Sequence, residues 1–348
     1  MELVPIINQY HDAFVDQYAT TLLPSHFSAI NAIRRCRTPD SGELYVHCTQ
    51  CDQAEWRPLS CGNRNCPQCQ NHEVSQWLDK QQAKLLPVEY FMVTFTLPCQ
   101  LRKLAWCNQK LMYTILFACI ASTLKDFGLN LKNLGADMCM TSVLHTHSRK
   151  LDYHPHVHVI VPGGGIDKRR KQWKKIKGKY LFNESALANV FRARFLDALN
   201  KENLPIPCGI PEKWVVDCAH VGKGKPALKY LSLYLYRGVI SENNIISNQN
   251  GYVTFKYIDN DTGNTEFRTL KGEAFLHLIL QHVLPRGFRR VRDYGFLHGN
   301  AKKILSLIQL ILHVVIEINF RPRPVFKCPK CKSPMVIMAF RRPAWKFG

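Results

Sequence analysis

Apolar and polar positions alternate most regularly in the middle of the chain. Val157–Val161 is alternating and β-branched, which predicts a strand. Asp137–Thr146 predicts a second strand, and the polar segment Ser148–Asp152 between the two is short enough to be a hairpin turn. We therefore expect a pair of neighbouring antiparallel strands here.

Flanking segments predict further elements. A strand is expected at Glu89–Leu97, ended by Pro98, and a helix over Leu101–Phe127, where apolar residues recur at helical spacing before Gly128. Similar patterns predict two more helices and another strand, at Ile7–Leu22, Leu187–Leu199 and Trp214–Cys218. Because a hairpin joins two of the strands, the sheet is expected to be at least partly antiparallel.

Histidines gather on the predicted hairpin. Five of them lie within residues 145–158, and the expected hairpin register places all five on the same face of the two strands. Because residues two apart on a strand share a face, His156 and His158 point the same way. If the turn centres near residues 150 and 151, His145 lies opposite His156, with Cβ atoms about 4.5–5.5 Å apart.

Three imidazoles around one point suit a divalent metal that must still bind substrate, so His145, His156 and His158 are the candidate ligands. His147 and His154 are further out and are expected to flank the site. The alternative is a polar strand face with surface histidines. A slip of the register by one residue would separate the three rings.

The charge of the whole chain narrows the class of partner. Its 348 residues have a formal net charge of +21, which favours a polyanion, with nucleic acid ahead of a membrane surface. The chain opens without a basic start followed by an apolar run, and its longest apolar runs are too short to span a bilayer. We expect a cytoplasmic protein with no membrane partner, whose fourteen cysteines are reduced or metal-bound.

Cysteines near the amino end form two Cys-x2-Cys pairs, Cys48 with Cys51 and Cys66 with Cys69. Fourteen residues separate the pairs, close to the spacing of a zinc ribbon, so we expect these four thiolates to hold one structural Zn²⁺. A third pair, Cys328 with Cys331, has no Cys or His after it and looks incomplete.

The expected four-cysteine zinc site does not include Cys36 and Cys61. Each could replace one of the four ligands, belong to a second site with His47 or His72, or be an ordinary buried thiol.

Positive charge is densest just after Gly163–Gly165. We expect these three glycines to form a flexible segment at the end of the strand that contains the histidines. Aromatic rings are interleaved with the basic residues, so phosphates could take the charge while unpaired bases stack on Trp173 or Tyr180. The alternative is a solvated loop. The candidates for DNA binding in this run are Lys168, Arg169, Arg170, Lys171, Trp173, Lys174 and Lys175.

A tyrosine pair lies downstream, on a helix expected over Pro226–Gly238. Tyr230 and Tyr234 are four residues apart and share one helix face. Tyrosines at this spacing are commonly core residues. In a basic chain with three clustered histidines they are also candidate nucleophiles, because a tyrosine can attack a phosphodiester polarised by a metal.

His156-Val157-His158 followed by these tyrosines resembles the HUH (His-hydrophobic-His) endonuclease superfamily, and the closer match is to its two-tyrosine rolling-circle insertion-sequence transposases. Leu233 departs from the pattern, where this family is expected to have a basic residue. The matching segments cover most of the chain and are Ser60–Gln70, Tyr90–Phe91, Thr94–Pro98, His154–His158, Val161–Gly165, Tyr230–Tyr234 and His282–Gly295.

The resemblance implies an α+β HUH endonuclease domain, with a mainly antiparallel sheet flanked by helices, preceded by a small zinc-ribbon-like domain. It implies catalytic Mg²⁺ or Mn²⁺ beside structural Zn²⁺, with His156 and His158 as ligands and the two tyrosines as nucleophiles. The substrate would be single-stranded DNA at transposon ends and target sites, cleaved and rejoined through a 5′-phosphotyrosine in the bacterial nucleoid. Further expected DNA contacts are Lys223, Lys225, Arg237, Arg286, Arg289 and Arg290.

Four consecutive segments are expected: a helical lead (1–30), a zinc-binding domain (31–85), the nuclease domain (86–300) and a carboxyl-terminal helix with a basic tail (301–348). A plasmid replication initiator or relaxase would share the chemistry without the whole set of motifs. A non-enzymatic zinc-ribbon regulator leaves the histidines and tyrosines unexplained, and a zinc hydrolase has no clear use for the tyrosines.

Overall fold

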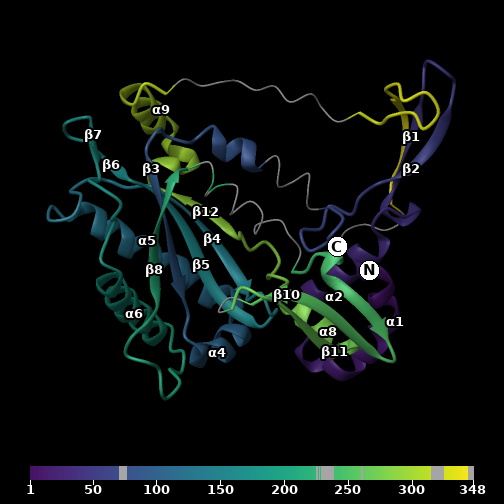
Figure 1. Cartoon of the computed structure of the whole chain (residues 1–348), viewed down its shortest axis with the longest axis horizontal. Coiled ribbons are helices and arrows are strands. Elements are labelled where there is room, and N and C mark those ends of the chain that lie inside the picture. The colour runs from purple at the N-terminus through teal and green to yellow at the C-terminus, as the bar shows by residue number, and fades with distance from the viewer. Residues whose placement is uncertain are drawn as a thin grey trace. The chain divides into compact units, whose positions relative to one another are not determined.

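The computed structural model describes residues 1–69, 77–224, 226, 228, 239–259, 262–314 and 325–343. It divides the chain into two compact units, each built from separate stretches of sequence. The cysteine unit comprises Met1–Glu73, Tyr236–Val283 and Glu317–Gly348, and the histidine unit comprises Val74–Leu235 and Leu284–Ile316 (Figure 1). The units therefore interleave along the chain, where the sequence suggested four consecutive segments.

The histidine unit is built on a five-stranded sheet in the order β12-β4-β5-β3-β8. Every neighbouring pair in it is antiparallel, which confirms an α+β fold with an antiparallel sheet. The strands are β3 (Glu89–Thr96), β4 (Met140–His147), β5 (Tyr153–Pro162), β8 (Val216–Lys223) and β12 (Val291–Tyr294).

One face of this sheet is apolar and is covered by helices. The alternate residues Phe91, Val93 and Phe95 of β3 are buried in one cluster with the helix residues around them, and the Phe95 ring lies 5.0 Å from that of Phe191. The covering helices are α4 (Arg102–Cys107), α5 (Gln109–Leu129) and α6 (Glu184–Lys201). Period-two alternation in the strands therefore leaves the opposite face for polar side chains.

The helix predicted over residues 101–127 is interrupted. A 3₁₀ turn at Cys99–Leu101 leads into α4, and Asn108 leaves the helical conformation between α4 and α5. Gly128, expected to stop the helix, lies inside α5, where a Cβ atom would come within 2.4 Å of the Met138 sulfur. Its missing side chain therefore permits close packing.

α5 is long and apolar enough, by length and composition alone, to cross a membrane. Within the histidine unit, however, Met112, Leu116 and Ile120 are fully buried in the same cluster as the sheet residues. Its apolar character is accounted for by the core of this unit.

Gly163–Gly165 is a closely packed segment, so the prediction that these glycines form a flexible segment after the histidine strand is wrong. β6 (Gly164–Asp167) pairs with β7 (Gln172–Lys175) in a hairpin, and all three glycines are buried. A Cβ on Gly164 would lie 2.6 Å from both the Lys174 carbonyl oxygen and the Trp173 ring. Glycine is needed here because the paired strand and its tryptophan lie against the backbone.

The histidine unit ends with β12 and three short helical segments. They are η5 (Gly295–Leu297), η6 (Gly299–Ala301) and α9 (Lys302–Ile311).

The cysteine unit combines helices with two three-stranded sheets. One sheet has the order β11-β10-β9 and the other β13-β1-β2. Gly272, at the start of α8, allows close contact with α1, because a Cβ there would lie 2.4 Å from the Tyr10 ring. The helices are α1 (Leu3–Tyr18), η1 (Ala19–Thr21), α2 (Pro24–Arg35), η2 (Pro39–Ser41), η4 (Glu242–Asn244) and α8 (Gly272–Leu280). The strands are β1 (Glu43–His47), β2 (Ala54–Pro58), β9 (Ile245–Gln249), β10 (Tyr252–Ile258), β11 (Thr265–Lys271) and β13 (Val336–Arg341).

Candidate functional site

Three histidines meet on the face of the histidine-unit sheet opposite the helices. His145 of β4 is paired directly with His156 of β5, so the predicted hairpin register is confirmed. The ring centroid of His145 lies 5.1 Å from that of His156 and 4.6 Å from that of His158. One nitrogen from each of the three rings lies within 4.8 Å of the others, a separation that one metal ion can bridge.

Burial keeps these imidazoles neutral. His145 is 5% and His158 9% exposed. Desolvation, reinforced by neighbouring His156, lowers the pKa of His158 to about 3, and desolvation also lowers the pKa values of His145 and His156. Each ring therefore has a lone pair available at neutral pH. The donor set fits a divalent transition ion such as Mn²⁺, and three nitrogens are softer ligands than Mg²⁺ prefers.

Hydrogen bonds hold two of the rings by their Nδ1 atoms. His156 Nδ1 lies 2.7 Å from the His154 carbonyl oxygen, to which an Nδ1–H donates. His158 Nδ1 lies 2.9 Å from Thr94 Oγ1, on the neighbouring strand β3. Because Nδ1 of these two rings has this partner, Nε2 is the nitrogen through which each ring could bind a metal ion. Sequence reasoning did not single out Thr94 for this role, although the β3–β5 register places it opposite His158.

Two arginines lie close to the histidine group. Arg102 Nη2 is 2.6 Å from His154 Nδ1. His154 does not belong to the group of three rings whose nitrogens lie close together. Arg290 lies near enough to His145 to contribute to the lowering of its pKa. Arg290 was a candidate for DNA binding, whereas Arg102 carried no signal in the sequence because it lies just after the turn that ends β3. His147 follows an irregularity in the β4 ladder and is not in the group.

The basic run forms the β6–β7 hairpin, and its charged tip is exposed. The backbone N–H groups of Arg169 and Arg170 donate to the Asp167 carboxylate, which fixes the turn. Trp173 differs from expectation: its ring is partly buried against Gly164 and 6.0 Å from the Phe296 ring, so it is not an open platform for a base. Lys174 donates to the Gly135 carbonyl at 2.8 Å. The remaining exposed candidates are Lys168, Arg169, Arg170, Lys171, Lys175, Lys223, Arg286 and Arg289.

Several predicted residues lie outside the part of the chain that the structure describes. These are the nucleophile candidates Tyr230 and Tyr234 and the DNA-binding candidates Lys225 and Arg237.

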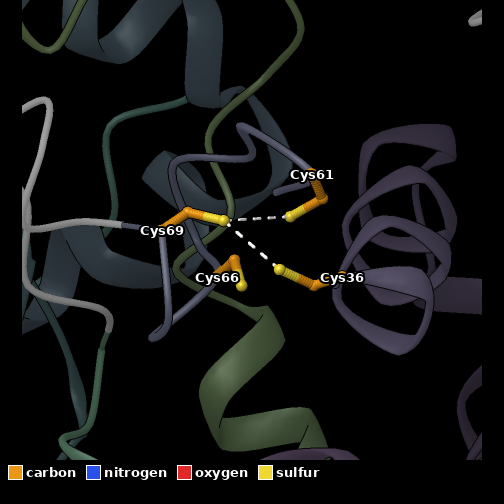
Figure 2. A group of neighbouring side chains, drawn as sticks. All are labelled: Cys36, Cys61, Cys66 and Cys69. Atoms are coloured by element: carbon orange, nitrogen blue, oxygen red, sulfur yellow. Dashed lines mark hydrogen bonds between the residues drawn. The ribbon is translucent and has the colours of Figure 1, made fainter. Parts of the chain in front are cut away.

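The cysteines are grouped differently from the expected single site. Cys66 and Cys69 lie with Cys36 and Cys61, the two cysteines that the sequence left unassigned. Figure 2 shows the four side chains gathered around one point, with Cys69 Sγ 3.3 Å from Cys36 Sγ and 3.5 Å from Cys61 Sγ. Cys36 comes from the end of α2 and the other three from the loop after β2.

Cys48 and Cys51 lie instead with Cys328 and Cys331, so the pairing of residues 48–51 with residues 66–69 is wrong. The physical reason is the sheet: β13 from the carboxyl end pairs with β1 and brings the distant cysteines beside Cys48. His47 belongs to neither group, because its Nε2 lies 2.6 Å from the Asp52 carboxylate.

Comparison with known proteins identifies two regions of the chain. A family model described as "Transposase zinc-binding domain" matches residues 6–97, and one described as "Putative transposase" matches residues 139–304. The "Putative transposase y4qJ" of Sinorhizobium fredii is 33% identical over 331 residues, covering 88% of this chain and 83% of that protein.

The "Transposase for insertion sequence element IS801" of Pseudomonas savastanoi pv. phaseolicola is 28% identical over 286 residues, covering 75% of this chain and 68% of that protein. No solved structure matches the chain. With its zinc-binding and transposase regions in the same order as the sequence motifs, the chain belongs to the two-tyrosine insertion-sequence transposases of the IS91 type.

Proposed function

We propose that this transposase cleaves and rejoins single-stranded DNA through a 5′-phosphotyrosine, at a divalent metal site formed by His145, His156 and His158. The observation that carries the proposal is the convergence of three neutral imidazoles, two of them buried and that of His156 half-buried, from two paired strands on one point. A polar strand face at the surface would not need His145 and His158 to be buried.

A bound Mn²⁺ or Mg²⁺ would neutralise charge on the scissile phosphate and orient it for in-line attack. The protein's own contribution is to hold the ligands rigidly. The two β strands set the spacing of the rings, and Thr94 and the His154 carbonyl fix their orientation. Arg102 and Arg290 place positive charge beside the site, where a phosphate oxygen would lie.

The proposed nucleophile is the phenolate of Tyr230 or Tyr234. Its oxygen forms a bond to phosphorus as the bond from phosphorus to the 3′ oxygen breaks, and the released 3′ oxygen takes up a proton. The 5′ phosphate stays on the tyrosine. Because one phosphoester replaces another, the 3′ hydroxyl can later attack the phosphotyrosine and reverse the step. Two tyrosines would allow one chain to hold two strand ends.

The proposed substrate is single-stranded DNA at the ends of the element and at its target. The exposed β6–β7 tip supplies lysine and arginine for phosphates, in a chain of net charge +21. Since the curated relatives come from bacteria, the proposed place of action is the nucleoid in the bacterial cytoplasm.

A gel assay tests the proposal. Labelled single-stranded DNA from the sequences flanking the coding region is incubated with the protein and Mn²⁺ and separated under denaturing conditions. We expect a covalent protein–DNA band that the Tyr230→Phe/Tyr234→Phe double variant does not form, whereas the exposed-tyrosine control Tyr252→Phe forms it normally. Binding without any covalent band in the unmodified protein would instead support a non-enzymatic DNA-binding role.

A further inference from the structure

We propose that Cys48, Cys51, Cys328 and Cys331 form a second structural zinc site, which ties the two ends of the chain together. The four cysteines lie within one ligand sphere, although Cys51 and Cys328 are 277 positions apart in the sequence. Neither matched family model reaches the second pair, because they cover residues 6–97 and 139–304.

The two Cys-x2-Cys segments have the same backbone geometry. In one, the N–H of Cys48 donates to the Gln53 carbonyl at 2.8 Å and that of Asp52 to the Cys48 carbonyl at 3.0 Å. In the other, the equivalent distances are 2.9 Å and 3.0 Å, from Cys328 to Ser333 and from Lys332 to Cys328.

The fourth residue after the first cysteine has a positive φ in both turns, +56° at Asp52 and +63° at Lys332. A non-glycine residue in this conformation is uncommon, so its recurrence at the same position shows that the chain builds one type of turn twice. Each turn presents two thiols on the same side, as a zinc knuckle requires.

The sulfur separations fit a shared metal. Cys48 Sγ lies 3.4 Å from Cys331 Sγ, and Cys51 Sγ lies 3.5 Å from Cys328 Sγ. Around a tetrahedral zinc with Zn–S bonds of about 2.3 Å, sulfurs lie about 3.8 Å apart. A disulfide would need about 2.05 Å, and all four cysteines are free thiols.

The surrounding contacts tie the same two segments together. β13 pairs with β1, and the Arg57 guanidinium donates to the Lys327 carbonyl at 3.1 Å. Arg341 forms an ion pair with Glu43 at 2.8 Å. The apolar cluster beneath them is small, comprising the buried residues Val46, Cys48, Cys328 and Met335. So small a core is a weak source of folding free energy, which a structural metal can supply.

Metal analysis of the 348-residue chain tests the proposal. After dialysis against buffer without added metal, we expect two zinc ions per chain, one for each four-cysteine group. Cys328→Ser/Cys331→Ser should hold one, and so should Cys48→Ser/Cys51→Ser. Combining these four substitutions should still leave one, because all four residues serve the same ion. The control Cys107→Ser/Cys208→Ser, which changes exposed cysteines outside both groups, should hold two.

Alkylation of the unmodified protein provides a second test that does not depend on how the variants fold. Cys331 and Cys107 are both exposed, so without a metal both should react readily with iodoacetamide. We expect Cys331 to be protected until a chelator removes zinc, while Cys107 reacts at once. Alkylation of Cys331 as fast as Cys107 in zinc-loaded protein, or two zinc ions in the Cys328→Ser/Cys331→Ser variant, would overturn the proposal.

Discussion

At the scale of single residues, the three-histidine group depends on burial as much as on position. Desolvation lowers the pKa of His158 to about 3, so the ring is neutral throughout the physiological range. A ligating imidazole also needs a partner on its other nitrogen to hold its orientation. The Thr94 hydroxyl and the His154 carbonyl would serve this purpose for His158 and His156 if these rings bind a metal, as we propose.

Thr94→Ala should weaken metal binding without removing a ligand. Loss of a hydrogen bond to a ligating imidazole typically costs roughly 10–100-fold in metal affinity or activity. We therefore expect a higher Mn²⁺ concentration for half-maximal formation of the covalent DNA adduct, and recovery in Thr94→Ser, which keeps the hydroxyl. An unchanged Mn²⁺ requirement in Thr94→Ala would show that this hydrogen bond does not support the metal site.

Tyr230 and Tyr234 should have unequal roles. On the predicted helix they lie one turn and about 6 Å of rise apart, so only one can be closest to a single metal. We expect Tyr234 to make the first cut, because it is further from the segment at residues 222–225. In a single-turnover assay, Tyr234→Phe should remove most of the adduct and Tyr230→Phe should spare much of it. Normal adduct in both single variants would show instead that the tyrosines are interchangeable.

At the scale of secondary-structure elements, the β6–β7 hairpin depends on a glycine. Gly164→Ala would force a methyl group to within 2.6 Å of the Lys174 carbonyl oxygen and the Trp173 ring. We expect a destabilisation of about 1–3 kcal/mol, measured as a lower melting temperature. Gly299→Ala is the matched control, since a Cβ there meets nothing within 4 Å. Equal melting temperatures for both variants would mean that the hairpin tolerates the extra atom.

The tip of the same hairpin should contribute to DNA binding through charge. Replacing Lys168, Arg169 and Arg170 by glutamine should weaken binding of single-stranded DNA. The slope of the logarithm of the association constant against the logarithm of the salt concentration should become shallower by about two, since each lost phosphate contact contributes about 0.7. Substituting the exposed Lys125, Lys201 and Lys213 in the same way is the control. An equal change in both triple variants would assign the effect to net charge alone.

The hairpin with the histidines could be predicted because its signals are local. Period-two alternation indicated the strands, and a short polar turn fixed the register that pairs His145 with His156. Thr94 was missed because its role depends on which strand lies on the other side of β5.

The pairing of the cysteines could not be predicted in the same way. Each Cys-x2-Cys turn is a local signal, but its partner is chosen by tertiary structure. β13 lies beside β1 and supplies Cys328 and Cys331, while Cys36 at the end of α2 joins the loop containing Cys66. Sequence proximity favoured the wrong pairing of two neighbouring turns.

At the scale of the whole molecule, DNA binding and chemistry are expected to be separable. Binding should come mainly from distributed positive charge, in a chain whose net charge is +21. Cleavage should depend on three imidazoles at one point of the histidine unit. Removing a single ring should therefore abolish the reaction while leaving most of the affinity.

The most direct measurement compares covalent adduct formation and DNA affinity in His145→Ala, His156→Ala and His158→Ala, with the exposed His298→Ala as control. Single-stranded DNA and Mn²⁺ are used throughout. We predict no adduct in any of the three variants, affinity close to that of the unmodified protein, and normal adduct in His298→Ala. Full adduct formation by the His145, His156 or His158 variant would contradict the assignment of that ring to the catalytic metal site.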